Sequence, residues 1–255
     1  MGKFDGVLLC TDIDGTLAVG PDIPKRNQTA LADFMAEGGL LSLCSGRGTD
    51  YLMKMEGVFP NAPYISFNGT EIYDGKTNRV LWQQGMKGEE CFQVIDYLKE
   101  NGLGYIHGYC CFDDGRSVGR EDEIGAFDTT CGQGRTVLKI VYVFPDEVTA
   151  EKTEEALKKR FPCYVFTRSW PEGVEQIHPM AGKGVAVKRL KELLGAHVLV
   201  CIGDQEIDHS MLQEADLAFA PANATQETMR LVREVFSPVQ EGALMDLVDA
   251  LPKYL

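Results

Sequence analysis

The sequence has no apolar run long enough to cross a membrane, and its first residues lack the apolar segment of a secretory signal. Gly6 occupies the position where an N-myristoylation signal needs serine or threonine. We therefore expect no membrane partner and a cytoplasmic location.

Basic residues are scarce relative to acidic ones. The chain has 25 Lys and Arg against 38 Asp and Glu, a formal net charge of −13. This balance disfavours binding to nucleic acid, although a local basic pocket can still hold a single phosphate group. With 255 residues the chain can form one large domain, or a core domain with an insertion.

None of the eight cysteines forms a C-x-x-C pair, which argues against a structural zinc site. Cys10, Cys44 and Cys201 lie inside apolar, strand-like runs, so we interpret them as buried reduced thiols; a set of disulfides is the alternative. The sequence also lacks internal repeats, low-complexity tracts and coiled-coil heptads, which excludes solenoid and fibrous architectures.

Two carboxylates follow the first apolar run. Residues 7–10 have the length and composition of a buried strand, and Asp12, Asp14 and Gly15 come directly after it. If the strand continued, the two carboxylates would lie on the same face. Like charges at that separation need a metal, a proton or another cation to compensate them. The alternative is an ordinary Asp-Gly hairpin turn.

Strand-like and helix-like segments alternate in the first third and the last quarter of the chain. Further strand-like runs occur at residues 40–44, 64–67, 198–202 and 217–220. Segments with the apolar spacing of helices lie between these runs, and a final helical segment is expected at residues 244–251. This alternation predicts an α/β fold with a parallel sheet and helices on its faces. Ligands collect beyond the carboxyl ends of such strands. The polar residues expected there are Asp12, Asp14, Ser45, Arg47, Asn68, Asp204 and Asp208.

The middle of the chain has a different pattern. Helices are expected at residues 89–101 and from Asp146 to Arg160, with strands at residues 104–112, 137–144, 163–167 and 174–177. Helices on one face of a largely antiparallel sheet would make an inserted α+β domain. We therefore divide the chain into a core of residues 1–83 and 180–255 and an insertion of residues 84–179, with glycine-bearing hinges at residues 84–88 and 178–184.

Four motifs, in this order, resemble those of the haloacid dehalogenase-like hydrolases. They are Asp12-Ile13-Asp14-Gly15-Thr16, Ser45 within Leu43-Cys44-Ser45-Gly46-Arg47, the lone cation Lys183, and the stretch from Gly203 to Asp208. The insertion between the second and third motifs, with Ser66-Phe67-Asn68-Gly69 before it, resembles the Cof-type phosphatases. The resemblance covers essentially the whole chain and implies a Rossmann-like parallel sheet core with an inserted α+β cap domain.

The resemblance also implies the chemistry of the site. Asp12 would be the nucleophile that forms an aspartyl-phosphate, and Asp14 would carry the proton. Mg²⁺ would be held by Asp12, Asp204 and the main-chain carbonyl of Asp14. Asp208 would support these ligands without binding the ion directly.

Lys183 and Ser45 would contact the phosphoryl oxygens, and Gly46, Arg47 and Asn68 would bind the substrate. The resemblance thus implies a Mg²⁺-dependent phosphatase for a small phosphorylated metabolite, such as a sugar phosphate. A phosphomutase and a non-catalytic phosphate-binding protein are the alternatives. Nothing in the sequence predicts the oligomeric state.

Several residues keep a second interpretation. Arg47 either binds substrate phosphate or pairs with a neighbouring acid, and Asn68 either lines the site or serves as a turn residue. Lys183 without its motif context would be a surface lysine at a helix start. His178 and Arg168 either contact the substrate or lie on the solvated surface of the cap.

The fourth motif departs from the family pattern at Ile207, where Asn usually precedes the final Asp. An isoleucine removes a polar contact that could steady Asp208 or Lys183. We expect a working enzyme whose metal site is modestly altered, so that Ile207→Asn raises Mg²⁺ affinity or turnover. Glu206 is expected to be exposed to solvent.

Overall fold

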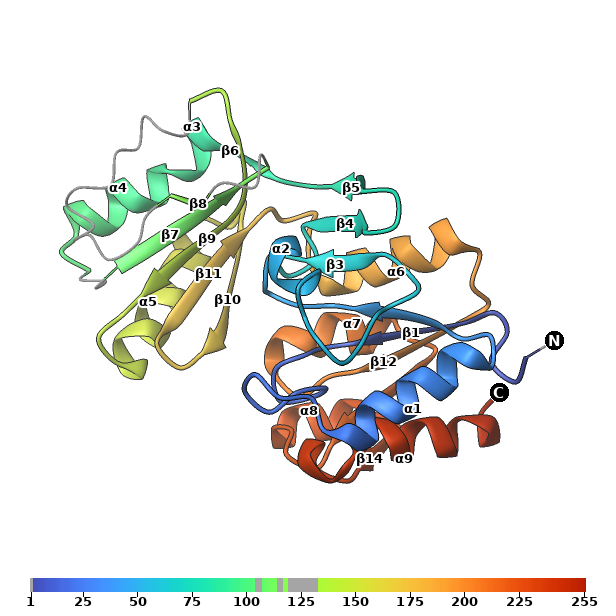
Figure 1. Cartoon of the computed structure of the whole chain (residues 1–255). Helices are drawn as coiled ribbons and strands as arrows, with labels where there is room; N and C mark the ends of the chain where they lie inside the picture. The colour runs from blue at the N-terminus through green and yellow to red at the C-terminus, as the bar shows by residue number, and fades with distance from the viewer. Residues whose placement is uncertain (1, 104–106, 114–116, 119–132) are drawn as a thin grey trace. The chain divides into compact units, whose positions relative to one another are not determined.

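The computed structural model describes residues 2–103, 107–113, 117–118 and 133–255, which form two compact units (Figure 1). The core unit consists of Met1–Trp82 and Lys183–Leu255, and the inserted unit of Gln83–Gly182. The insertion expected at residues 84–179 lies within the inserted unit.

A five-stranded parallel sheet forms the centre of the core unit, with strand order β14-β13-β12-β1-β2. Strand β1 lies between β12 and β2, and Cys10 is in register with Cys201. Every residue of β1 is buried, which explains the unbroken apolar run in the sequence. The strands are β1 (Val7–Thr11), β2 (Leu40–Leu43), β12 (Val198–Ile202), β13 (Leu217–Pro221) and β14 (Glu234–Phe236).

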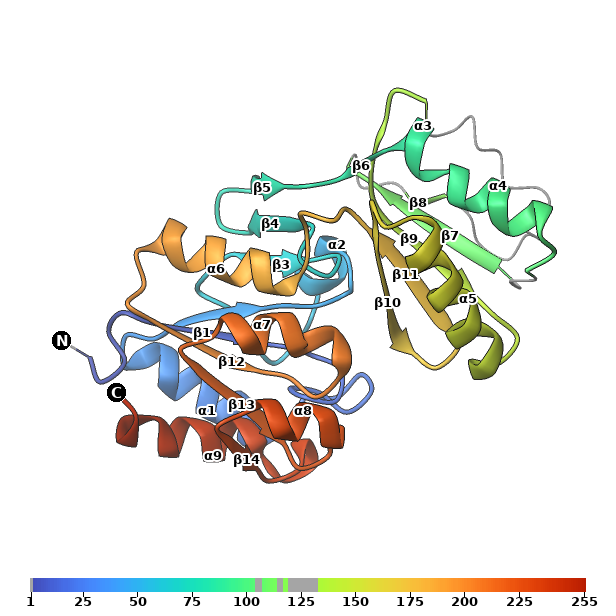
Figure 2. The same cartoon turned by 180° about the vertical axis from the view of Figure 1, so that it is seen from behind.

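Helices cover both faces of this sheet (Figures 1 and 2). On one face of the sheet, Leu9 and the other apolar side chains pack against α1 (Lys25–Ala36) and α9 (Ala243–Ala250). Leu8 on the opposite face packs against α6 (Lys183–Leu194) and α7 (His209–Glu214). The predicted α/β architecture is therefore confirmed. The short helices of this unit are α2 (Thr49–Leu52), α8 (Gln226–Leu231) and the 3₁₀ helices η3 (Glu206–Asp208), η4 (Val239–Glu241) and η5 (Leu251–Lys253).

The strand expected at residues 64–67 is not a member of the parallel sheet. It forms β3 (Tyr64–Ser66), which pairs antiparallel with β4 (Glu71–Asp74) in a three-stranded sheet completed by β5 (Arg79–Gln83). One parallel bridge, Cys44 to Ile65, joins it to the end of β2. Phe67 and Asn68 adopt positive φ values of 49° and 59°, which reverse the chain. The chain therefore returns as a hairpin instead of crossing over through a helix.

The inserted unit contains a largely antiparallel sheet with strand order β10-β11-β9-β7-β8, and β6 pairs with β9. Its helices pack on the sheet through a separate apolar cluster that includes Ile95, Ile140 and Leu157. The strands are β6 (Met86–Lys87), β7 (His107–Phe112), β8 (Ser117–Val118), β9 (Thr136–Val143), β10 (Val165–Trp170) and β11 (Gly173–Ile177).

Three described helices belong to the inserted unit. The helix expected at residues 89–101 is divided into α3 (Gly88–Cys91) and α4 (Gln93–Glu100). Helix α5 (Glu147–Arg160) begins as predicted, because the Asp146 carboxylate accepts a hydrogen bond of 2.8 Å from the Thr149 amide. Part of the strand expected at residues 104–112 lies outside the described residues, since its first described position is 107.

The described residues contain no membrane-spanning helix and no disulfide. None of the helices among them is long and apolar enough to cross a bilayer. Seven cysteines are described, and all are free thiols, as the reduced-thiol interpretation predicts. The eighth, Cys131, lies outside the described ranges.

Candidate active site

Asp12 and Asp14 diverge where β1 ends. The strand ends at Thr11, and the main-chain amides of Thr16, Leu17 and Ala18 donate hydrogen bonds to the Ile13 carbonyl. The chain therefore forms a turn here instead of an extended strand, so the alternation that would place the two carboxylates on one face does not apply. Asp12 is 7% exposed, whereas the Asp14 side chain is 49% exposed. The two acids therefore have different surroundings and different partners.

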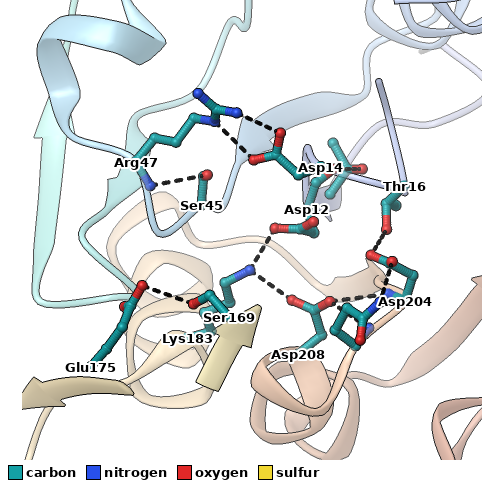
Figure 3. A network of polar contacts seen from close by, with 12 residues as sticks. Asp12, Asp14, Thr16, Ser45, Arg47, Ser169, Glu175, Lys183, Asp204 and Asp208 are labelled. Carbon is teal, nitrogen blue, oxygen red and sulfur yellow. Dashed lines mark hydrogen bonds and ion pairs between the residues drawn. The ribbon is translucent and has the colours of Figure 1, made fainter. Parts of the chain in front are cut away.

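Lys183, at the start of α6, is buried between two acids (Figure 3). Its Nζ donates to Oδ1 of Asp12 and to Oδ1 of Asp208, each at 2.6 Å. Burial by itself lowers the pKa of Lys183, but the charges of Asp12 and Asp208 outweigh burial and hold that pKa well above its ordinary value. The ammonium is therefore charged, and the interpretation of Lys183 as a surface lysine is wrong.

The stretch after β12 contributes two more buried acids. Asp204 Oδ1 accepts a hydrogen bond of 2.8 Å from the Thr16 hydroxyl. Asp208 is fully buried, and its Oδ2 accepts from the main-chain amides of Asp204 at 3.0 Å and Gln205 at 3.2 Å. With Lys183 on its Oδ1, Asp208 has three donors, one of them charged. Asp204, in contrast, has the Thr16 hydroxyl and the Gln205 side-chain amide, the latter at 3.3 Å. The Asp208 side chain therefore fits a supporting position better than direct contact with a metal ion.

The acids of this cluster carry more negative charge than one lysine can balance. Carboxylate oxygens of Asp12, Asp204 and Asp208 lie within 4.8 Å of one another. Burial, reinforced by the neighbouring carboxylates, raises the pKa of Asp12 to about 8 and that of Asp204 to about 6. A small divalent cation with oxygen ligands would remove this repulsion. The donor set thus fits a magnesium-type ion held by Asp12 and Asp204.

Ser45 and Arg47 follow β2. Ser45 is 1% exposed, and its Oγ accepts a hydrogen bond of 3.2 Å from the Arg47 amide. The Arg47 guanidinium donates to both oxygens of Asp14, at 2.8 and 2.7 Å, and stacks 4.1 Å from the centre of the Tyr51 ring. Of the two interpretations of Arg47, the structure contains the pairing with an acid.

Asn68 packs against the loop that carries Ser45. Its main-chain N–H donates to the Ser45 carbonyl at 3.0 Å, and the residue is 2% exposed. A Cβ atom at Gly46 would lie 2.6 Å from Asn68 Oδ1, so this close approach requires glycine at position 46. Asn68 is thus both a turn residue and a neighbour of the Ser45 loop.

The contacts of Arg168 and His178 that the structure describes lie within the inserted unit. Arg168 pairs with Glu154 at 3.1 Å, and the ring of His178 contacts Gln84 at 3.3 Å. In the core unit, Glu206 is exposed as predicted, and Ile207 is half-buried.

Sequence reasoning missed two residues of the core unit. Thr16 belongs to the first motif but had no assigned role, although its hydroxyl bonds the Asp204 carboxylate. Asn223 lies in no motif, yet its side chain donates to the Gly15 carbonyl at 2.7 Å. No local pattern reveals Asn223, because its partner is 208 residues away in the chain.

Known proteins resemble this chain over most of its length. The family model of the haloacid dehalogenase-like hydrolases matches residues 9–248. The Bacillus subtilis protein "Putative phosphatase YxeH" is 24% identical over 241 residues, with 87% of this chain and 89% of that protein covered.

Two solved structures share the fold. A haloacid dehalogenase-like hydrolase from B. subtilis has a TM-score of 0.80 at 18% identity and covers 96% of this chain and 99% of its own. The subclass IIB sugar phosphatase BT4131 has a TM-score of 0.79 at 17% identity, covering 96% and 98%. The family match spans nearly the whole sequence, so the chain belongs to the haloacid dehalogenase-like hydrolases, as its four motifs predict.

Proposed function

We propose that this enzyme is a Mg²⁺-dependent phosphatase that hydrolyses a small sugar phosphate through an aspartyl-phosphate. The observation that carries the proposal is the buried arrangement of Asp12, Lys183 and Asp204. It supplies a carboxylate nucleophile, a fixed positive charge and a metal ligand at one edge of the sheet.

Asp12 has one oxygen available for attack. Its Oδ1 accepts from Lys183, and its Oδ2 accepts no hydrogen bond from the residues that the structure describes. In the first step Oδ2 attacks phosphorus, the bond from phosphorus to the ester oxygen breaks, and the leaving alkoxide takes a proton from Asp14. In the second step Asp14 takes a proton from water as the water oxygen attacks phosphorus, and the bond from phosphorus to Asp12 Oδ2 breaks. Inorganic phosphate leaves, and the Asp12 carboxylate and protonated Asp14 are restored.

The transferred phosphoryl group needs positive charge and hydrogen-bond donors. Lys183 has three N–H donors and uses two of them on Asp12 and Asp208, which leaves the third for a phosphoryl oxygen. The Ser45 hydroxyl is the neutral donor in this proposal. Mg²⁺, bound by Asp12, Asp204 and the Asp14 main-chain carbonyl, would supply charge neutralisation at the phosphoryl oxygens.

The substrate contacts are part of the same proposal. Gly46, Arg47 and Asn68 would bind the substrate, and Arg47 must then exchange Asp14 for an anionic group. The fold shared with a named sugar phosphatase supports a sugar phosphate as substrate. The seven free thiols among the described cysteines support a reducing, cytoplasmic location.

Phosphate release from p-nitrophenyl phosphate and from a panel of sugar phosphates tests the proposal. We expect activity with Mg²⁺, no activity with EDTA, and no activity for Asp12→Asn. The control is Asp33→Asn, which alters an exposed acid on α1 and should behave as wild type. Equal inactivity of wild type and Asp12→Asn would refute a phosphatase and favour a phosphate-binding protein.

Two further measurements test the mechanism. Asp14→Asn should slow sugar phosphates more than p-nitrophenyl phosphate, because nitrophenolate leaves without needing a proton. Transfer of the phosphoryl group to a second sugar hydroxyl, with no free phosphate, would instead identify a phosphomutase.

A further inference from the structure

Asn223 connects three segments of the core unit that are far apart in the sequence. It lies in the exposed turn after β13. Its Nδ2 donates to the Gly15 carbonyl at 2.7 Å, and its Oδ1 accepts from the Val239 amide at 2.9 Å. Both ends of this amide therefore have a fixed main-chain partner.

The first of these contacts constrains the peptide that follows Asp14. Gly15 has a φ of +88°, and its N–H donates to the Ala18 carbonyl at 3.0 Å. The peptide unit is planar and trans, so the direction of the Gly15 N–H sets the direction of the Asp14 carbonyl. Glycine can rotate its two flanking peptides at little steric cost. The Asn223 contact opposes that rotation by holding the second peptide in place.

The same turn also contacts the other side of the acid cluster. The Thr225 amide donates to the Asp204 main-chain carbonyl at 3.0 Å. A Cβ atom at Gly15 would lie 2.4 Å from Asp204 Oδ2, which shows how closely the first-motif loop approaches that carboxylate. The turn after β13 thus holds both the Gly15 loop and the segment that carries Asp204.

We infer that Asn223 is a positioning residue for the metal site, because it holds the Gly15 loop and, with it, the Asp14 carbonyl that would bind the ion. The inference rests on the proposed function, because it requires a cation at Asp12 and Asp204. Both polar atoms of the Asn223 side chain bond main-chain groups, so Asn223 would act through the Gly15 loop.

Isothermal titration of Mg²⁺ into wild type and Asn223→Ala, without substrate, tests this positioning. Of the two hydrogen bonds that this variant loses, the one to the Gly15 carbonyl acts on the metal site, and its loss should weaken Mg²⁺ binding about fivefold. The Mg²⁺ concentration for half-maximal activity should rise by a similar factor, whereas KM for substrate at saturating Mg²⁺ should stay near that of wild type.

Asn61→Ala is the matched control. Asn61 Nδ2 donates to the Gly39 carbonyl at 2.8 Å and its Oδ1 accepts from the Leu41 amide at 2.8 Å, the same pair of bonds at the opposite end of β2 from the acids. Asn61 is also the more buried of the two residues, so its loss should cost at least as much stability in urea.

The outcomes separate this inference from the proposed function. If wild type binds no Mg²⁺, the proposed function fails. If wild type binds Mg²⁺ and Asn223→Ala and Asn61→Ala bind it with the same Kd as wild type, the positioning role of Asn223 is refuted. It is also refuted if Asn223→Ala loses much more stability than Asn61→Ala, because its role would then be structural.

Discussion

Replacing Lys183 with methionine should strongly destabilise the metal-free protein. The lysine side chain is 2% exposed and contacts carboxylates that are 10% and 0% exposed. With charges about 3 Å apart and an effective dielectric constant of about 20, each pair contributes roughly 5 kcal/mol of attraction before desolvation is subtracted. Removing one partner of a buried pair leaves uncompensated charge and costs about 3–5 kcal/mol.

Lys191→Met is the matched control on the same helix. Lys191 contacts Asp216 at the same distance, 2.6 Å, but the two side chains are 27% and 47% exposed. An exposed pair contributes below about 1 kcal/mol. The comparison therefore contrasts a buried lysine that has two buried acid partners with a more exposed lysine that has one.

Urea unfolding in EDTA at about pH 9, above the Asp12 pKa of about 8 so that the carboxylate is ionised, measures both losses. We expect about 3–5 kcal/mol for Lys183→Met and below about 1 kcal/mol for Lys191→Met. The Lys183→Met loss should shrink on acidification, because protonation of Asp12 removes its repulsion with the neighbouring carboxylates. Equal losses for the two variants, or a larger Lys183→Met loss in acid, would refute the reasoning.

Three further predictions follow from the same site. Burial raises the pKa of Asp12 to about 8 and that of Asp204 to about 6. Between pH ~4 and those values the folded state therefore binds more protons than the unfolded state, so the free energy of unfolding decreases as the pH rises, and the Tm of the metal-free protein should decrease with it. Because Mg²⁺ binds ionised carboxylates, the increase in Tm that it causes should be larger at about pH 8 than at about pH 5; a Tm of the metal-free protein that rises with pH would contradict this. Arg47→Met should cost below about 1 kcal/mol of stability, because both partners are exposed, while raising KM severalfold; an unchanged KM would leave Arg47 without a substrate role. Ile207→Asn should change the Mg²⁺ Kd by less than about twofold, because Asp208 already has partners on both oxygens; a tenfold gain would show that the family asparagine does support the site.

The expectation for Ile207 changes once the structure is considered. From the sequence, an isoleucine at this position removes a contact that could steady Asp208 or Lys183. In the structure, Lys183 and two main-chain amides already hold the Asp208 carboxylate. The site does not depend on an asparagine at position 207 to orient that carboxylate.

The sequence by itself determined the α/β architecture and the residue types at the strand ends. Apolar runs such as residues 198–202, each followed by acids or a serine, are local patterns, and parallel strands bring their carboxyl ends to one edge whatever the loops do. For this reason the sequence is sufficient to predict that Asp12, Ser45 and Asp204 share one site.

Only the tertiary structure decided which of these groups touch. In the structure Asp14 lies apart from Asp12 and pairs with Arg47. Strand β3 pairs antiparallel with β4, and the Asn223 side chain donates to the Gly15 carbonyl. Each of these outcomes depends on backbone angles within loops and on contacts between segments distant in the chain. Hydrophobic periodicity reports which face of an element is buried, but it does not specify those loop angles or the partner that a polar side chain finds across the fold.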